Sequence, residues 1–368
     1  MCGIVAYLGQ RTAQPIIIEG LKRLEYRGYD SAGVALLSNG VIKIQKTSGR
    51  IAALEAVLDK PQPNETLGLG HTRWATHGAP NQINAHPHKD YTGKIALVHN
   101  GIIENYSTLK TWLQSEGVTF VSDTDTEVVA NLIGYFYEKC DSGGKQSPLP
   151  KLIGAIQDTV SSFMPSLTLK KPEGQNRFEW AVQRALQEVH GTYGLGILCA
   201  DCPDMFIGAK KGSPLILGVS EGEYILASDA AAIIEHTARA IYLSDNEMVI
   251  VTADGFHTKT IDNIAVTKSL ENIEFSLEQI ELGSFKHHML KEIFEQPKAL
   301  ATCMGGRIDP QNDKIHLGGI REQLRAMTHI KRIIITACGT AFHAGLVGEF
   351  LFEQLARITT ETEYASEF

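Results

Sequence analysis

The feature that most restricts the fold is the alternation of short apolar segments with amphipathic ones between residue 2 and about residue 201. Short apolar runs bounded by turn residues predict strands. The segment PIIIEGLKRLEYRG, which follows the first such run, predicts an amphipathic helix. The predicted strands are CGIVAYLG, SAGVALLS, GLGHTRWATHG and KIALVHNGII. The sequence therefore predicts a domain that mixes α and β structure.

Two further helices, STLKTWLQSEG and VSDTDTEVVANLIGYFYEKC, are expected after Asn105. In the second, Thr124 and Glu127 have the spacing of a capping box before an apolar-striped helix. Residues from about 140 to 177 are rich in Ser, Gly, Pro and Lys at both ends, and they predict an inserted excursion around a short helical core. Regular structure then resumes, and the first domain (1–267) is expected to close near Thr267.

A linker is predicted at 268–284, where the sequence is polar and weakly patterned. The segment FKHHMLKEIFEQPKALATCM then predicts a helix that stops at Pro297. The last segment, from KRIIITACGT to Phe368, predicts a strand, a tight loop, an amphipathic helix and the start of a second strand, as at the opening of a doubly wound sheet. Because two strands do not make such a sheet, the second domain (285–368) is expected to be incomplete.

The composition argues against several classes of partner. Lys and Arg total 34 against 42 Asp and Glu, for a formal charge of -8 and no basic stretch, so no nucleic-acid partner is expected. No apolar run approaches the roughly 18 residues that span a bilayer, and the N-terminus lacks a basic signal region, so a cytoplasmic protein without membrane contact is predicted. Six cysteines without framework spacing predict free thiols.

Some histidine and cysteine patterns resemble metal sites without completing one. Cys199 and Cys202 have CxxC spacing but no second pair, which favours a turn at the end of a strand. His86 and His88 also lack a complete ligand set. No metal is predicted.

Cys2 has two interpretations. At the start of an apolar strand, a cysteine is often an ordinary small hydrophobic residue. Methionine is, however, removed when the next residue is small, which would leave Cys2 with both a thiol and the free α-amine. An α-amine has a reference pKa of about 7.7 to 8.0, so it accepts a proton near neutrality, and nucleophile and base would then share one residue.

Arg73 lies in HTRWATHG, at 71–78. Its guanidinium fork can hold a carboxylate through two parallel hydrogen bonds, and the hydroxyls and glycine around it suit a loop that folds over a small polar ligand. A substrate with an α-carboxylate would fit this segment. A surface loop with a solvated arginine is the alternative, and a structural role is the alternative for His71 and His77.

Asn100 and Gly101 follow the apolar strand IALV. An amide side chain and an exposed glycine N–H are the donors that an oxyanion hole needs beside a thiol nucleophile. Asn-Gly is also among the strongest turn dipeptides. Asp125 stands where a helix is predicted to begin, so it either complements the helix dipole or binds an α-ammonium group.

Eight segments, taken together, carry a resemblance to a known family. Six occur in the order and spacing of the glutaminase domain of the glutamine-fructose-6-phosphate aminotransferases: MCGIV, LEYRGYDSAG, HTRWATHG, NAHPH, VHNGIIEN and SDTDTE. KEIFEQP and ACGT resemble the entry to that family's sugar-phosphate isomerase domain. The amidophosphoribosyltransferases and asparagine synthetases share Cys2 and a version of the Arg, Asn-Gly and Asp positions, but not LEYRGYDSAG followed by these two segments.

The resemblance implies an N-terminal nucleophile hydrolase, an α+β fold with a four-layer αββα sandwich, followed by the beginning of an α/β doubly wound isomerase domain. It implies that Cys2 attacks the side-chain amide of glutamine, with its own α-amine shuttling protons. Asn100 and the N–H of Gly101 would stabilise the tetrahedral oxyanion. Arg27 and Gly28 would belong to the surroundings of the nucleophile.

The same resemblance assigns residues to the glutamine head group. Arg73 and Thr76 would hold the α-carboxylate with His77 nearby, and Asp125 would bind the α-ammonium group. Trp74 would lie in a loop that closes over glutamine and gates the passage of ammonia.

The second domain resembles the family's first sugar-phosphate loop at Gly339 and Thr340. Glycine permits the tight turn, and the threonine hydroxyl can donate to a phosphate oxygen at a helix N-terminus. Ala341 stands where the family usually has serine, which removes one phosphate donor.

The implied activity converts glutamine and fructose 6-phosphate to glutamate and glucosamine 6-phosphate, without a metal or organic cofactor. The chain as given is expected to act as a glutaminase, and a homodimer is expected only of a full-length enzyme. Two alternatives stay open. One is an amidotransferase with another sugar-phosphate acceptor, and the other is a non-catalytic module that senses a sugar phosphate.

Overall fold

The computed structural model describes residues 2–74, 78–140, 171–273, 283–304, 307–309, 314–315 and 327–368. The contacts between residues divide the chain into two compact units, Met1–Glu281 and Leu282–Phe368, which are described separately.

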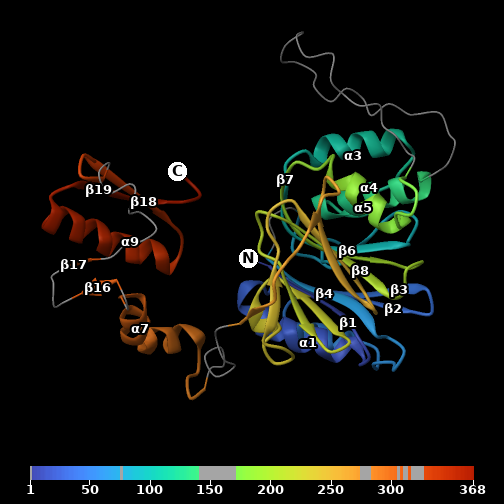
Figure 1. Ribbon diagram of the computed structural model, residues 1–368, viewed down its shortest axis with the longest axis horizontal. Coiled ribbons are helices and arrows are strands. Elements are labelled where there is room, and N and C mark those ends of the chain that lie inside the picture. Colours follow the sequence, from blue (N-terminus) through green and yellow to red (C-terminus); the bar gives the residue numbers. More distant parts are fainter. Residues whose placement is uncertain are drawn as a thin grey trace, which may run out of the picture. The chain divides into compact units, whose positions relative to one another are not determined.

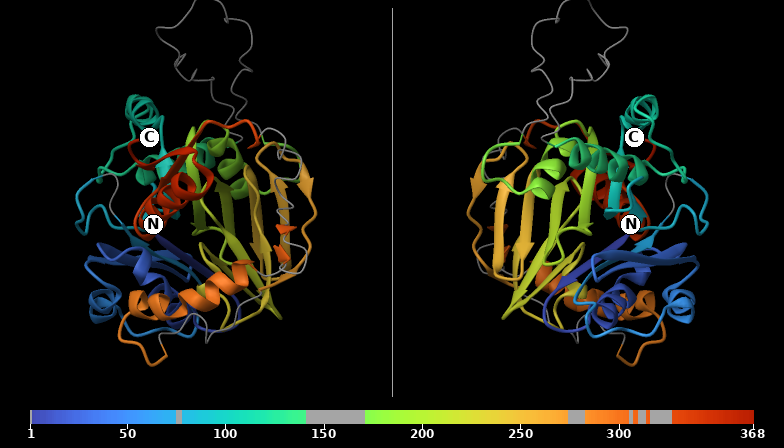
Figure 2. Two further views of the ribbon diagram at one scale, coloured as in Figure 1. Left: turned by 90° about the vertical axis from the view of Figure 1, so that its left-hand side faces the viewer. Right: turned by 90° about the vertical axis from the view of Figure 1, so that its right-hand side faces the viewer.

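The first unit contains two antiparallel sheets (Figure 1). The first sheet has eight strands, in the spatial order β15 (Glu271–Asn272), β11 (Arg239–Tyr242), β9 (Ile216–Ser220), β10 (Glu223–Ala227), β1 (Gly3–Leu8), β4 (Leu67–Arg73), β2 (Ser31–Ser38) and β3 (Val41–Ser48). The second has seven, in the order β14 (Ala265–Val266), β13 (Gly255–Thr260), β12 (Glu247–Thr252), β8 (Met205–Lys211), β7 (Gly191–Cys199), β6 (Ile95–Ile103) and β5 (His88–Lys89). Figure 2 shows the later strands, coloured yellow to orange, running side by side.

Side-chain alternation explains why the two sheets stack. Successive residues of a strand point to opposite faces of its sheet, and β1 is apolar at every position except its initial glycine. Ile4 and Ala6 lie in a buried cluster that also contains Ala96 and Val98 of β6, so this face of β1 packs against the other sheet. Val5 and its like-facing neighbours belong to a second cluster on the opposite face.

Helices cover the outer face of each sheet (Figure 1). The eight-stranded sheet is covered by α1 (Ala13–Leu24) and α2 (Ile51–Val57), whose apolar residues complete the cluster on that face. The seven-stranded sheet is covered by α3 (Tyr106–Ser115), α4 (Asp125–Lys139) and α5 (Arg177–Leu186). The result is the four-layer αββα sandwich that the resemblance implies, and the predicted fold class is confirmed.

The start of α4 follows the predicted capping box in part. The Oγ1 atom of Thr124 accepts a hydrogen bond from the backbone N–H of Glu127 at 3.3 Å. The Glu127 carboxylate does not return to Thr124. It accepts instead from the N–H groups of Val121 and Ser122, at 2.8 and 2.6 Å, and so holds the approach to the helix.

Two expected boundaries differ from the structure. The first unit extends beyond Thr267, because β15 pairs with β11 inside the range expected to be a linker. The predicted stop at Pro297 is wrong, since α7 (His288–Met304) continues through it. The fixed φ of proline is itself helical, and the hydrogen bond that it removes lies on a helix that is largely exposed. Most of the expected insertion, at 141–170, lies outside the described residues.

The second unit contains the expected strand, helix and second strand. They are β18 (Arg332–Ala337), α9 (Thr340–Leu351) and β19 (Thr359–Tyr364), with one π-helical turn (Phe352–Ala356) after α9. The two strands pair in parallel, as a βαβ unit requires. A short hairpin, β16 (Ile308–Asp309) with β17 (Lys314–Ile315), precedes them. Among the helices of the described residues, none is long and apolar enough to cross a membrane.

Candidate active site

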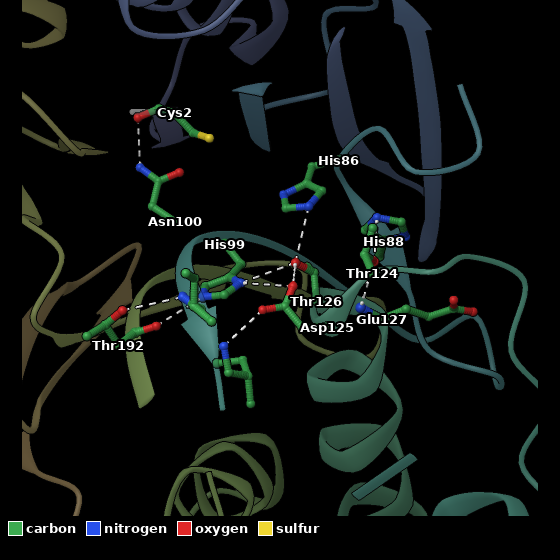
Figure 3. A network of polar contacts seen from close by, with 12 residues as sticks. Cys2, His86, His88, His99, Asn100, Thr124, Asp125, Thr126, Glu127 and Thr192 are labelled. Carbon is green, nitrogen blue, oxygen red and sulfur yellow. Dashed lines mark hydrogen bonds and ion pairs between the residues drawn. The ribbon is translucent and has the colours of Figure 1, made fainter. Parts of the chain in front are cut away.

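A cavity of about 280 Å³ opens in the first unit, where Cys2 meets the ends of β4 and β6 and the beginning of α4. Six residues singled out from the sequence line it: Cys2, Arg73, Trp74, Asn100, Gly101 and Asp125. In Figure 3, Cys2 lies next to Asn100, and the Asp125 carboxylate lies in a second group with His99 and Thr126. Residues that are far apart in the sequence thus share one small polar cavity.

Cys2 is positioned by the strand that it precedes. β1 lies between β10 and β4, so its first residues are fixed from both sides. The Cys2 sulfur accepts a hydrogen bond from the backbone N–H of Trp74 at 3.1 Å. The backbone of Arg73 and Trp74 also packs directly against Gly28. A Cβ atom at Gly28 would lie 2.9 Å from the carbonyl carbon of Arg73 and 3.1 Å from the Trp74 nitrogen, so glycine leaves room for the Trp74 N–H at this place.

Burial sets the acidity of the Cys2 thiol. Burial raises the pKa of Cys2 above its usual value, and the hydrogen bond from Trp74 acts in the opposite direction. A raised pKa leaves less thiolate at neutral pH than a free cysteine would have. A nucleophilic role for Cys2 therefore requires a base close to the sulfur.

Asn100 is fixed at both ends of its amide. Its Nδ2 donates to the carbonyl oxygen of Cys2 at 2.9 Å, and its Oδ1 lies 2.9 Å from Nε2 of His71. The carbonyl oxygen of His99 also lies 3.1 Å from the same His71 nitrogen. Because both oxygens only accept, the His71 nitrogen carries the proton and donates, which holds the Nδ2 of Asn100 toward Cys2.

Gly101 occupies a backbone conformation that requires glycine. Its φ is 137°, and a Cβ atom there would lie 2.1 Å from the carbonyl oxygen of Thr192 on the neighbouring strand. β6 and β7 therefore approach closely at the floor of the cavity.

Asp125 is the first residue of α4, and its carboxylate is buried. One oxygen accepts from the backbone N–H of Ile103 at 2.9 Å, and the other lies 3.4 Å from the Thr126 hydroxyl and 3.9 Å from Nδ1 of His99. A carboxylate at this position is also favoured by the helix dipole. Its charge can therefore be kept inside the cavity.

Arg73 ends β4 with a buried side chain. Its two terminal nitrogens donate to the carbonyl oxygens of Ala79 and Gly78, at 3.3 and 3.4 Å. Burial lowers the pKa of this guanidinium, while Cys2 and Asp125 act in the opposite direction. An arginine nonetheless stays charged near neutrality, so the cavity contains a fixed cation as well as a fixed anion.

Comparisons with known proteins identify similar sequences and folds. Residues 57–142, which include Arg73, Asn100, Gly101 and Asp125, match the family described as "Glutamine amidotransferase domain". This stretch of the chain is therefore similar to glutamine amidotransferase domains. Its whole length is 46% identical to a protein of Chlorobaculum tepidum and 44% identical to one of Bacteroides thetaiotaomicron, both named glutamine–fructose-6-phosphate aminotransferase [isomerizing]. The chain spans about half the length of these relatives, 55% of each.

Solved structures share the fold of the first unit. The glutamine phosphoribosylpyrophosphate amidotransferase from B. subtilis, in complex with ADP and GMP, matches with a TM-score of 0.51 at 23% identity, over 71% of this chain and 49% of that one. A structure described as the allosteric regulatory enzyme of purine biosynthesis matches with a TM-score of 0.52 at 24% identity and the same coverage. The first unit thus shares its fold with these two solved enzymes.

The sequence analysis considered His71, His86 and His88 separately and did not predict that they form a buried row in the first unit. The rings of His71 and His86 lie 4.3 Å apart, and those of His86 and His88 lie 5.0 Å apart. His86 and His99 both contact the Thr126 hydroxyl, at 3.1 and 3.2 Å (Figure 3). The NAHPH segment carried the signal for two of them, but sequence alone does not show that β4 and β6 supply the others.

Burial keeps three of these rings neutral. It lowers the pKa of His71 to about 3, and it lowers the pKa values of His86 and His88 well below their ordinary range. Neutral imidazoles beside a buried arginine avoid a second buried positive charge. These histidines are therefore hydrogen-bonding supports for the candidate site at neutral pH.

The other expected site residues lie at the rim of this cavity, in the second unit, or outside the residues that the structure describes. Thr76 and His77 lie outside the described residues, as does the side chain of Arg27, whose backbone ends a 3₁₀ turn (Glu25–Arg27). Trp74 is 45% exposed at the rim of the cavity, and its ring contacts Tyr29 edge-on.

Gly339 and Thr340 belong to the second unit, where they form the start of α9. Gly339 caps the helix with a φ of 59°, and Thr340 is the first helical residue. This turn requires glycine and exposes the N-terminal end of α9.

A larger and more open groove of about 810 Å³ lies elsewhere on the first unit, over β3 and β5. Its partly buried cation, Lys46, donates to the carbonyl oxygens of Ile83, Ala85 and Pro87, at 3.1, 2.6 and 3.2 Å. These bonds use all three ammonium hydrogens, and burial lowers the pKa of Lys46 to about 8. The groove therefore offers much weaker recognition chemistry than the smaller cavity.

Proposed function

We propose that this chain hydrolyses glutamine, with Cys2 as the nucleophile after removal of Met1. The single observation that carries the proposal is that the Cys2 sulfur, the Asn100 amide, the Arg73 guanidinium and the Asp125 carboxylate line one cavity. The fixed charges of Arg73 and Asp125 complement the α-carboxylate and α-ammonium groups of an amino acid. Binding the head group in this way would present the side-chain amide to the sulfur.

The proposed reaction proceeds in two steps. The α-amine of Cys2 accepts the thiol proton, the sulfur bonds to the amide carbon, and an Nδ2 hydrogen of Asn100 stabilises the oxyanion. The α-ammonium returns the proton to the leaving nitrogen, and ammonia departs as the thioester forms. Water, deprotonated by the same amine, then cleaves the thioester and releases glutamate.

The names of the relatives extend the proposal to the longer protein. Proteins that match this chain over its full length are named glutamine–fructose-6-phosphate aminotransferases. We infer that the ammonia is transferred to fructose 6-phosphate, and that the turn at Gly339 and Thr340 contributes to sugar-phosphate binding. A different sugar-phosphate acceptor is the competing candidate, because Ala341 supplies no hydroxyl group beside Thr340.

A glutaminase assay tests the proposal. The intact mass of the purified chain is first measured by mass spectrometry to establish that Met1 is absent. Glutamate and ammonia are then measured with glutamine as substrate. Equal amounts of both products are expected, and none from Cys2→Ala. Full activity in protein that retains Met1, or in Cys2→Ala, would contradict the mechanism. The same assay with different sugar phosphates identifies the acceptor by which of them stimulates hydrolysis.

A further inference from the structure

Asn84 connects the two charged residues of the candidate site without lining the cavity. It is 0% exposed, although it lies in the loop between β4 and β5. A fully buried polar side chain in a loop needs partners for each of its polar atoms. The amide of Asn84 finds them in two segments that are distant in the sequence.

One side of the amide reaches the segment that holds Arg73. The Nδ2 atom of Asn84 donates to the carbonyl oxygen of Ala79 at 3.1 Å. The same oxygen accepts from the Arg73 guanidinium at 3.3 Å. The backbone N–H of Asn81 donates to this oxygen as well, at 2.8 Å, so Asn84 and Arg73 share an acceptor that the loop backbone holds in place. The position of the guanidinium is thereby tied to the position of Asn84.

The other side of the amide reaches the beginning of α4. The Oδ1 atom of Asn84 accepts from the backbone N–H of Asp123 at 3.0 Å, and Nδ2 also lies 3.4 Å from the Asp123 carboxylate. Asp123 stands two residues before Asp125. The chain of bonds from Arg73 through Ala79 and Asn84 to Asp123 therefore joins the cation of the cavity to its anion.

The atoms packed around Asn84 leave its side-chain amide no space for another orientation. Gly78 has a φ of 76°, and a Cβ atom there would lie 2.6 Å from Nδ2 of Asn84 and 3.2 Å from the Cβ atom of Asp123. The backbone N–H of Asn84 is also occupied, because it donates to Oδ1 of Asn81 at 2.8 Å. The loop is thus closed directly onto the Asn84 amide.

We propose that Asn84 is a positioning residue that sets the separation between the Arg73 guanidinium and the Asp125 carboxylate, and through it the affinity for the α-amino acid head group. This inference rests on the proposed glutamine site and assigns it a residue that touches neither substrate nor sulfur. Only an amide supplies both donors and an acceptor at this place. In Asn84→Asp, a carboxylate would face the Ala79 carbonyl and the Asp123 carboxylate, and Asn84→Ala would remove the acceptor of the Asp123 N–H and the link from Asp123 to the Ala79 carbonyl.

Two reagents that alkylate the same sulfur separate positioning from reactivity. A chloromethyl ketone analogue of glutamine carries the α-carboxylate and α-ammonium groups, whereas iodoacetamide carries only an amide. With each reagent the Cys2 sulfur bonds to the carbon that carries the halogen and the halide ion leaves, chloride from the one and iodide from the other, and modification of the Cys2 peptide is followed by mass spectrometry. For Asn84→Ala and Asn84→Asp we expect the chloroketone rate at low reagent concentration to fall about tenfold or more, with the iodoacetamide rate within about twofold of the parent. The KM for glutamine should rise by a similar factor, with a much smaller change in kcat.

Asn131→Ala is the matched control. Asn131 is also a buried asparagine, and its Oδ1 accepts from the backbone N–H of Tyr91 at 2.7 Å, but among the described residues no hydrogen bond joins its side chain to Arg73 or Asp125. It should lower the melting temperature without changing the ratio of the two alkylation rates. Asn84→Asp keeps the shape of the side chain and serves if Asn84→Ala does not fold.

Three results would overturn the inference. They are an unchanged rate ratio in a folded Asn84 variant, an equal fall with both reagents, and the same change of ratio in Asn131→Ala. A different result addresses the proposed function itself. If the parent chain reacted with iodoacetamide but showed no saturable reaction with the chloroketone, the glutamine site would be wrong.

Discussion

The side chain of Asn100 donates a hydrogen bond to the carbonyl oxygen of Cys2 across 2.9 Å. This bond uses one of the two Nδ2 hydrogens, and the donor from His71 prevents the amide from turning over. The amide group that holds the Cys2 backbone therefore also sets the direction of its second Nδ2 hydrogen. The position of the sulfur and the direction of the proposed oxyanion donor are therefore not independent.

Removal of the Asn100 amide should affect the chemical step. Asn100→Ala is expected to lower kcat for glutamine hydrolysis by roughly 10²- to 10³-fold with little change in KM, as for the loss of one oxyanion donor. Steady-state kinetics measure both constants, and circular dichroism checks that the variant is folded. If KM rose and kcat stayed constant, Asn100 would be a binding residue.

Substitution of Asp125 or Arg73, the proposed partners of the glutamine head group, should weaken glutamine binding. Asp125→Asn retains an oxygen that can accept from the Ile103 N–H, so its stability should change little while the charge is lost. We expect the specificity constant for glutamine to fall by one to two orders of magnitude, or about 1.5 to 3 kcal/mol. Arg73→Lys should have a similar effect, because a point charge does not replace a bidentate fork. Unchanged specificity constants in both variants would contradict the prediction and show that Asp125 and Arg73 have structural roles only.

An added methyl group at Gly28 should disturb the surroundings of the nucleophile. In Gly28→Ala the new Cβ atom must displace the backbone of Arg73 and Trp74, at a cost of about 1 to 3 kcal/mol in the free energy of unfolding. Loss of the Trp74 bond would raise the pKa of Cys2 further, so alkylation of Cys2 by iodoacetamide at pH 7.5 should slow down. Gly196→Ala is the control, because the nearest atom to its Cβ lies at an ordinary 3.4 Å. Equal alkylation rates in both variants would contradict the prediction.

The buried histidines should make the fold sensitive to acid. Burial lowers the pKa values of His71, His86 and His88 in the folded state, whereas in the unfolded chain they titrate near 6.5. Above pH 6.5 both states are neutral. As the pH falls below that value the unfolded state alone binds protons, so each ring removes about 1.4 kcal/mol of stability per pH unit, or about 4 for all three.

Urea titrations between pH 7.5 and 5 measure this slope. His88→Gln should reduce it by about a third, whereas His190→Gln, at an exposed position, should leave it unchanged. Equal slopes in the parent and in His88→Gln would show that His88 is protonated in the folded state or titrates weakly in the unfolded one.

Local sequence signals predicted the elements that carry the candidate site. The Thr124 cap located the start of α4, and the apolar run before Asn100 located β6, because both features depend on residues close in sequence. The order of the strands was not predictable in this way. No local pattern states that β1 pairs with β10, and the fold class came from the resemblance.

The supporting residues were harder to recognise for the same reason. Asn84 and His71 act through partners that the sequence places far away, at Asp123 and Asn100 respectively. Pro297 shows the opposite case, in which a strong local signal was overridden on an exposed helix. Local chemistry therefore indicated which residues have charge or reactivity, and tertiary contacts decided which of them meet.

The place of β1 inside its sheet has a consequence for biosynthesis. One of its edges pairs with β4, but the other pairs with residues 223–227, so that edge has no partner until most of the first unit has been translated. The residues of β1 are thus translated well before the strand is enclosed on both sides. Aminopeptidases that trim the initiator methionine act on short, freshly emerged chains, so maturation of the terminus can precede its enclosure. The order of translation separates processing of the nucleophile in time from completion of the cavity that would use it.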